Sequence, residues 1–153
     1  TTYMCLEQLE RRVQDGMCVM DLGTGSGLLA QAALLLGASW VLAVDTEADS
    51  IRASRRNLKE AGLAKQVKII RGSIPQPLGV DMDMVVANIS AKVLIELAEP
   101  IASSMKPGGI LVASGVLDER GDEVKEAFSE AGLTEVEIQH SEDWFALVYQ
   151  REA

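Results

Sequence analysis

The sequence contains a single histidine, His140, and only two cysteines, Cys5 and Cys18, in 153 residues. One histidine is too little material for a histidine-based metal site or a Ser-His-Asp triad, which disfavours zinc enzymes and serine hydrolases. The cysteines lie in apolar surroundings and outside any metal-ligand spacing, so we expect reduced thiols in a cytoplasmic protein. The sequence therefore predicts no metal site.

Long hydrophobic runs are also lacking, and none approaches the ~18 apolar residues that a membrane helix needs. The first residues have neither the basic start nor the apolar core of a signal peptide. We therefore expect no membrane partner. Because the chain does not begin with methionine, we expect residues 1–153 to be one domain from the C-terminal part of a longer protein.

Positive charge is scarce, with 14 Lys and Arg against 23 Asp and Glu and a net charge of −9. Such a chain repels a phosphate backbone unless its cations gather on one face, so the composition predicts no direct nucleic-acid partner. An acidic surface could attract a basic protein, although plain solubility explains the charge more simply.

The most informative segment present is a glycine-rich loop between two apolar runs. The first run, within residues 18–22, carries Asp21 near its end, and the second, residues 28–36, indicates a buried helix. A strand that turns into a helix through glycines lets a ligand lie almost against the backbone, because no Cβ intervenes. The glycines stand at three alternate positions: Gly23, Gly25 and Gly27.

A second acid supports a nucleoside ligand. The next apolar run ends in Asp45, about 20 residues beyond the loop, the separation at which an acid meets a ribose in nucleoside-binding α/β folds. The loop and Asp45 together predict a nucleoside cofactor.

Apolar runs alternate with amphipathic segments along most of the chain. We predict helices over residues 2–14, 27–36, 47–61, 93–98 and 119–131, with 101–105 continuing the layer of 93–98 beyond Pro100. We predict strands over residues 18–22, 39–44, 67–70, 82–87, 110–114, 136–139 and 145–149, a loop at 75–77 and a turn at 106–109. This order predicts an α/β fold with a doubly wound, mostly parallel seven-stranded sheet. The last two strands are too close for a crossover helix, so one strand near the C-terminus must run antiparallel.

Polar residues follow or end the first four predicted strands: Asp21, Asp45, Ser73 and Asn88. Because the carboxyl ends of parallel strands meet at one edge of a sheet, we expect these side chains to converge there. Asp45 can accept two hydrogen bonds from the vicinal hydroxyls of a ribose. This edge is the predicted cofactor site.

Two cofactor classes fit this site, nicotinamide dinucleotides and S-adenosylmethionine. Residues 25–30 satisfy the dinucleotide pattern G-x-G-x-x-A, which is a weak signal alone. Asp21 stands just ahead of the glycines, where a pyrophosphate would meet a carboxylate but a sulfonium and an α-amino group would be accepted. The final pair of strands also fits a methyltransferase better than a dehydrogenase.

Longer stretches give the chain a more specific resemblance, and together they cover essentially all of it: residues 1–7, 21–27, 43–45, 85–89, 106–109, 114–117 and 144–148. The chain resembles class I S-adenosylmethionine-dependent methyltransferases, and most closely the PrmA family, which methylates a ribosomal protein of the large subunit. The glycine loop is common to class I enzymes, whereas the paired threonines at 1–2 and Ala-Asn-Ile at 87–89 distinguish the family. Family members carry an additional N-terminal substrate-recognition domain, which this sequence does not include.

The resemblance implies S-adenosylmethionine as cofactor, with contacts from Thr2, Gly23, Asp45 and Asn88. Reasoning from the residues alone adds a second group to this site: Asp21, Gly25 and Gly27.

The implied reaction is methyl transfer to amino groups of a protein, on lysine or the N-terminus, with a basic ribosomal protein as partner. We expect Asn88 to act in catalysis, because its amide oxygen can hold the hydrogens of an acceptor amine and aim its lone pair. Other interpretations stay open, namely a class I methyltransferase for another protein or a small molecule, and a cofactor-binding module without turnover. A nicotinamide dehydrogenase is the least favoured. Ser73 is the reason for considering a module without turnover, because many class I enzymes have at this position an acid that contacts adenine.

Overall fold

A seven-stranded sheet forms the centre of the protein, in the order β3-β2-β1-β4-β5-β7-β6. The computed structural model describes residues 2–75 and 80–152, so the predicted loop at 75–77 lies largely outside the described residues. The strands are β1 (Cys18–Leu22), β2 (Trp40–Asp45), β3 (Val67–Arg71), β4 (Met82–Asn88), β5 (Met105–Leu117), β6 (Leu133–Ser141) and β7 (Trp144–Arg151). The first five strands pair in parallel, and β7 runs antiparallel to both β5 and β6. The predicted topology, with one antiparallel strand, is confirmed.

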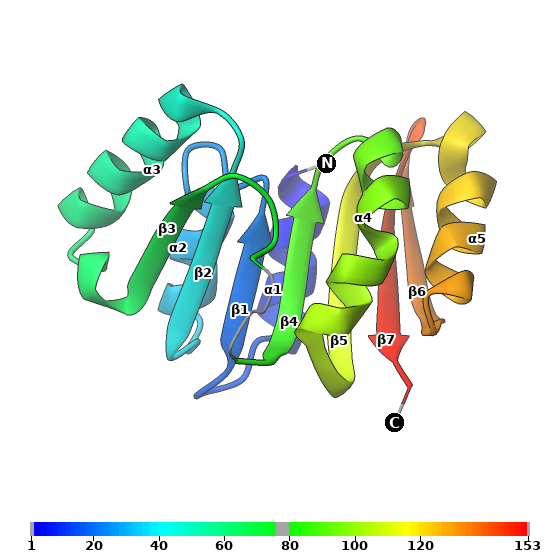
Figure 1. Cartoon of the computed structure of the whole chain (residues 1–153), viewed down its shortest axis with the longest axis horizontal. Helices are drawn as coiled ribbons and strands as arrows, with labels where there is room; N and C mark the ends of the chain where they lie inside the picture. The colour runs from blue at the N-terminus through cyan, green and yellow to red at the C-terminus, as the bar shows by residue number, and fades with distance from the viewer. Residues whose placement is uncertain (1, 76–79, 153) are drawn as a thin grey trace.

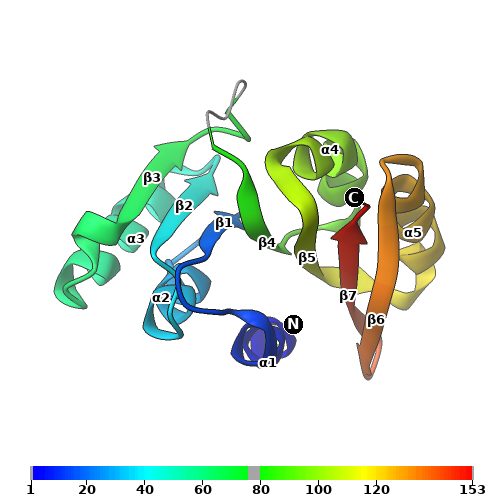
Figure 2. The same ribbon diagram turned by 90° about the horizontal axis from the view of Figure 1, so that it is seen from below.

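Helices cover both faces of this sheet (Figures 1 and 2). They are α1 (Thr2–Arg12), α2 (Leu28–Leu35), α3 (Ala48–Glu60), α4 (Ala91–Ser104) and α5 (Gly121–Glu130), with 3₁₀ turns η1 (Ala64–Gln66) and η2 (Asp118–Arg120). One face carries α1, α2 and α3, and the other carries α4 and α5. None of the helices in the described ranges is long and apolar enough to cross a membrane.

Alternating side chains of the strands supply two separate cores. Val19 of β1 packs with α1 and α2 on one face, and the next residue, Met20, packs with α4 on the other. Both are fully buried, because successive side chains of a strand point to opposite faces. Cys5 of α1 also lies in the first core, and burial raises the pKa of its thiol to about 12. Neither Cys5 nor Cys18 forms a disulfide among the described residues.

Several predicted boundaries differ from the observed ones, most of all in α4 and at the start of β5. The helix that begins at Ala91 runs through Pro100 to Ser104 without a break. Proline removes one backbone hydrogen bond, but Ile101 and Ala102 beyond it are buried in the core, and this burial holds the helix together. The predicted turn at 106–109 belongs to β5, which begins at Met105 because that residue pairs with Met82 of β4.

The carboxyl ends of the parallel strands lie along one edge of the sheet, at the top of Figure 1. The helix α1 begins at the same edge, at Thr2. The fold thus gathers the ends of β1, β2, β3 and β4 with the first turn of α1.

Candidate functional site

One cavity of about 540 Å³ opens at this edge, within the size range of pockets for small organic ligands. Three predicted site residues line it: Gly23, Asp45 and Asn88. Ser73 lines it too, as expected from its place after β3. The strand ends therefore converge as predicted.

Two of the three glycines of the loop are required by close packing against neighbouring residues, and not only by space for a ligand. Gly23 has φ +77°, and a Cβ there would overlap the side chain of Ile89. A Cβ at Gly27 would lie 3.2 Å from Cβ of Ser54 on α3. Gly25 alone of the three faces open space, with φ +55°. The structure thus leaves open space at Gly25, but neither Gly25 nor Gly27 is among the residues that line the cavity.

Asp45 joins the glycine loop to the start of α3. Its Oδ2 accepts a hydrogen bond from the backbone N–H of Gly25 at 2.9 Å, and its Oδ1 accepts one from the N–H of Glu47 at 2.9 Å. The carboxylate is half-buried at the cavity wall. Each oxygen keeps a second lone pair, so Asp45 can hold the loop and accept hydrogen bonds from a ligand at the same time.

Asp21 lies beneath the loop rather than in the cavity lining. It is 1% exposed, and its Oδ2 accepts hydrogen bonds from Thr24 Oγ1 at 2.7 Å and from the N–H of Ala30 at 3.1 Å. Its Oδ1 has no hydrogen-bond partner among the described residues. Burial raises the pKa of the Asp21 carboxyl to about 6. A buried acceptor without a donor is costly, so this oxygen is suited to a donor from outside the chain.

Thr2 and Asn88 meet across the edge of the sheet. Nδ2 of Asn88 donates a hydrogen bond to Thr2 Oγ1 at 3.1 Å, which ties the first turn of α1 to the end of β4. Asn88 lines the cavity, and this hydrogen bond joins Thr2 to it. Because Asn88 donates through Nδ2, its amide oxygen is not used in this bond and can accept a hydrogen bond from a ligand.

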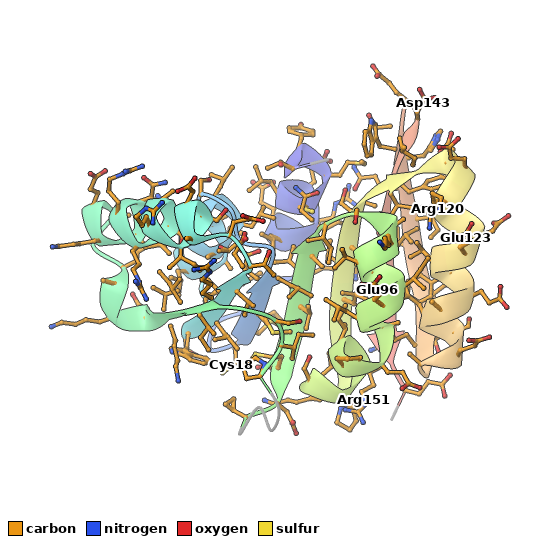
Figure 3. All side chains as sticks on the ribbon, turned by 45° about the horizontal axis from the view of Figure 1, so that its top comes forward. Cys18, Glu96, Arg120, Glu123, Asp143 and Arg151 are labelled. Atoms are coloured by element: carbon orange, nitrogen blue, oxygen red, sulfur yellow. The ribbon has the colours of Figure 1, made fainter. Side chains whose placement is uncertain are left out.

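Sequence reasoning missed the wall that α4 provides. Val93, Glu96 and Leu97 line the cavity together with Ile89, and Figure 3 shows Glu96 on this helix. Their spacing of three and four residues places them on one helix face, which was a usable signal. The backbone of Ile89 lies close to Gly115 of β5: a Cβ at Gly115 would lie only 2.6 Å from the carbonyl oxygen of Ile89.

This combination of fold and site matches one protein family. The model of the family described as ribosomal protein L11 methyltransferase (PrmA) matches residues 1–152. The chain belongs to the PrmA family.

Individual relatives agree with this membership. A ribosomal protein L11 methyltransferase of Chloroflexus aurantiacus is 38% identical over 99% of this chain and 53% of its own length. The protein of that name from Bacillus subtilis is 36% identical over 99% of this chain and 49% of its own. The chain thus spans about half the length of these PrmA relatives.

Solved structures agree as well. A ribosomal protein L11 methylase from Lactobacillus delbrueckii subsp. bulgaricus superposes with a TM-score of 0.94 at 29% identity, covering all of this chain and 79% of that one. A SAM-dependent O-methyltransferase from Thermotoga maritima has a TM-score of 0.83 at 15% identity, covering 99% of this chain and 64% of that one. At that identity the second similarity shows the fold alone.

Proposed function

We propose that this chain is the catalytic domain of a PrmA-type enzyme that transfers a methyl group from S-adenosylmethionine to a ribosomal protein. The observation that carries the proposal is the cavity at the carboxyl ends of β1 to β4, bordered by Gly23, Asp45 and Asn88, in a chain of this family. Membership of the family gives S-adenosylmethionine as the cofactor.

The residues of the site suit the parts of this cofactor. Asp45, held by the N–H of Gly25, would accept hydrogen bonds from the ribose hydroxyls, and Gly23 would give backbone close to the ligand. The unpartnered Oδ1 of Asp21 would accept a hydrogen bond from the α-ammonium group, directly or through one water. The bond between Thr2 and Asn88 would close the site on the side of α1.

When bound, the cofactor supplies an electrophilic methyl group on a positive sulfonium. The contribution of the chain is to align the acceptor and exclude water, so positioning accounts for much of the rate. We propose that the acceptor is an amine, of a lysine or an N-terminus, and it must arrive neutral. The amide oxygen of Asn88 would accept a hydrogen bond from this amine and direct its lone pair.

The test is methyl transfer from labelled S-adenosylmethionine to purified ribosomal protein L11 by the full-length protein. We expect incorporation into amino groups, located by mass spectrometry of peptides, and a large loss in an Asn88→Ala variant. Asp49→Asn is the matched control, because Asp49 is an exposed carboxylate on α3 that pairs with Arg52 and is not among the residues that line the cavity. Binding of the cofactor without any transfer would favour a module without turnover, and transfer to small molecules would favour a different acceptor.

A further inference from the structure

A cluster of hydrogen-bonded polar side chains joins α1 to the edge strand β6. Its centre is Gln8 of α1, which is fully buried although it is polar. The side-chain Nε2 of Gln8 donates to Glu137 Oε2 and to Gln139 Oε1, both at 3.0 Å. Its Oε1 accepts a hydrogen bond from Arg12 Nε at 2.9 Å. Both N–H groups and the carbonyl oxygen of this buried amide therefore have partners.

Glu137 of β6 is the anion of this cluster. Besides the bond from Gln8, its Oε1 accepts one from Arg12 Nη2 at 3.0 Å, and its Oε2 accepts one from Arg11 Nη1 at 3.1 Å. The hydrogen bond from Gln8, together with the two arginines, holds the pKa of the Glu137 carboxyl below its usual range. Three residues of α1 thus bind a single carboxylate of the sheet.

A bulge in β6 turns Glu137 toward α1. Glu135 lies opposite Tyr149 of β7, which is buried in the core on the side of α4 and α5. After the register shift, Glu137 lies opposite Val148, which is buried in the core on the side of α1 and α2. In a regular strand residues two apart share a face, so without the bulge Glu137 would point away from α1. The backbone of the edge strand is therefore shaped for this contact.

The same helix presents Thr2 to Asn88, about 9 Å before Gln8 along the helix axis. Cys5 and Leu9 hold α1 in the core, but apolar contacts have no direction and tolerate small rotations and shifts of a helix. Hydrogen bonds weaken steeply when their angle or length changes. The cluster therefore fixes the rotation and height of α1, and with them the place of Thr2.

We propose that Gln8 and Glu137 are positioning residues for Asn88, acting through α1 and Thr2. The amide of an asparagine can turn by half a rotation with little change of shape. The bond from Nδ2 to Thr2 selects the orientation in which the amide oxygen is available to a ligand. In the other orientation an acceptor amine would meet N–H donors. This consequence for catalysis rests on the proposed function, in which Asn88 holds the amine.

The side-chain amide of Asn88 reports this positioning without any turnover. Its N–H signals in the ¹⁵N–¹H spectrum of the full chain are assigned by their loss in Asn88→Asp. Thr2→Val removes the acceptor, and Gln8→Met removes the bonds of the cluster at a similar side-chain volume. We expect both substitutions to move the Asn88 signals in the same direction. Gln14→Met, the same change at an exposed glutamine beyond the end of α1, should leave them in place, and unmoved signals in Gln8→Met would overturn the proposal.

A double variant separates positioning through Thr2 from a general loss of stability. Substitutions that act through one contact are not additive. With the full-length protein and ribosomal protein L11, we expect kcat to fall roughly tenfold in Thr2→Val, in Gln8→Met and in the double variant alike, because each loses the same hydrogen bond. A loss on the order of 100-fold in the double variant, the product of two independent effects, would overturn the proposal.

Variants of Glu137 supply a conservative rescue. Glu137→Gln keeps an oxygen that accepts from Gln8, whereas Glu137→Ala does not. The residue is half-buried on an edge strand, so both variants should fold. We expect Glu137→Ala to reproduce the loss of kcat in Gln8→Met and Glu137→Gln to avoid most of it, and equal losses in the two would overturn the proposal. If the full-length protein transfers no methyl group, the proposed function fails, whereas the Asn88 spectra still decide this inference.

Discussion

The buried carboxylate of Asp21 makes a quantitative prediction about pH. Its pKa rises from 3.8 to about 6 on folding, chiefly because the side chain is removed from water. Each pKa unit corresponds to about 1.4 kcal/mol, so the ionised carboxylate costs the folded state about 3 kcal/mol. Between about pH 4 and pH 6 the native chain holds the proton that the unfolded chain releases. The free energy of unfolding therefore falls as pH rises through this window.

Asp21→Asn tests this reasoning, because it keeps an acceptor oxygen for Thr24 and Ala30 but cannot ionise. A constant effect of the new amide group shifts the difference in the free energy of unfolding between variant and natural chain equally at every pH, so it drops out of the change of that difference with pH. We expect the difference between them to grow by about 2 kcal/mol in favour of the variant between about pH 4 and pH 7. Urea unfolding across this range measures it.

Parallel stability curves for the two chains would refute the argument, since they would mean that Asp21 does not titrate differently on folding. Asp49→Asn, at an exposed carboxylate, serves as the control and should leave the pH dependence almost unchanged. The proposed contact of Asp21 with the α-ammonium group adds a second readout. S-adenosylhomocysteine should bind more weakly as pH falls below about 6, and this dependence should disappear in Asp21→Asn.

Three further substitutions test the site. Asp45→Asn should weaken binding of S-adenosylhomocysteine by about 1–3 kcal/mol in calorimetry, because the ribose loses a charged acceptor; an unchanged affinity would place the ribose elsewhere. Gly23→Ala should lower the free energy of unfolding by more than about 1 kcal/mol in urea, because φ is +77° and the new Cβ overlaps Ile89; full stability would contradict that packing. Asn88→Ala should lower kcat on the order of 100-fold with a smaller change in cofactor affinity, and equal losses in both would make Asn88 a binding residue only.

The elements of the fold were predictable because each has a local signature. The strand Cys18–Leu22 was predicted with its observed bounds, since an apolar run between Gly16 and the glycine loop leaves few alternatives. The predicted element boundaries were wrong where a contact with a residue distant in sequence determines the end of the element. β5 extends back to Met105 because β4 lies beside it, and α4 continues through Pro100 because the residues beyond are buried.

The site divides in the same way. Glycine spacing and strand ends predict that Gly23, Asp45 and Asn88 share one edge of the sheet, and all three line the cavity. The wall from α4 and the bond between Asn88 and Thr2 required the packed chain. Those two residues are 86 positions apart, and their local sequence does not encode the contact.

The sequence by itself determined the order of strands and helices, the single antiparallel strand and the edge at which a nucleoside would bind. These follow from periodicity and chain connectivity, which act over a few residues or a single crossover. Only the tertiary structure decided that Asp21 lies buried beneath the loop, with one oxygen unpartnered among the described residues, and that α4 forms a wall of the cavity. Burial and cavity shape depend on neighbours from separate elements, so they exist only once the chain has packed.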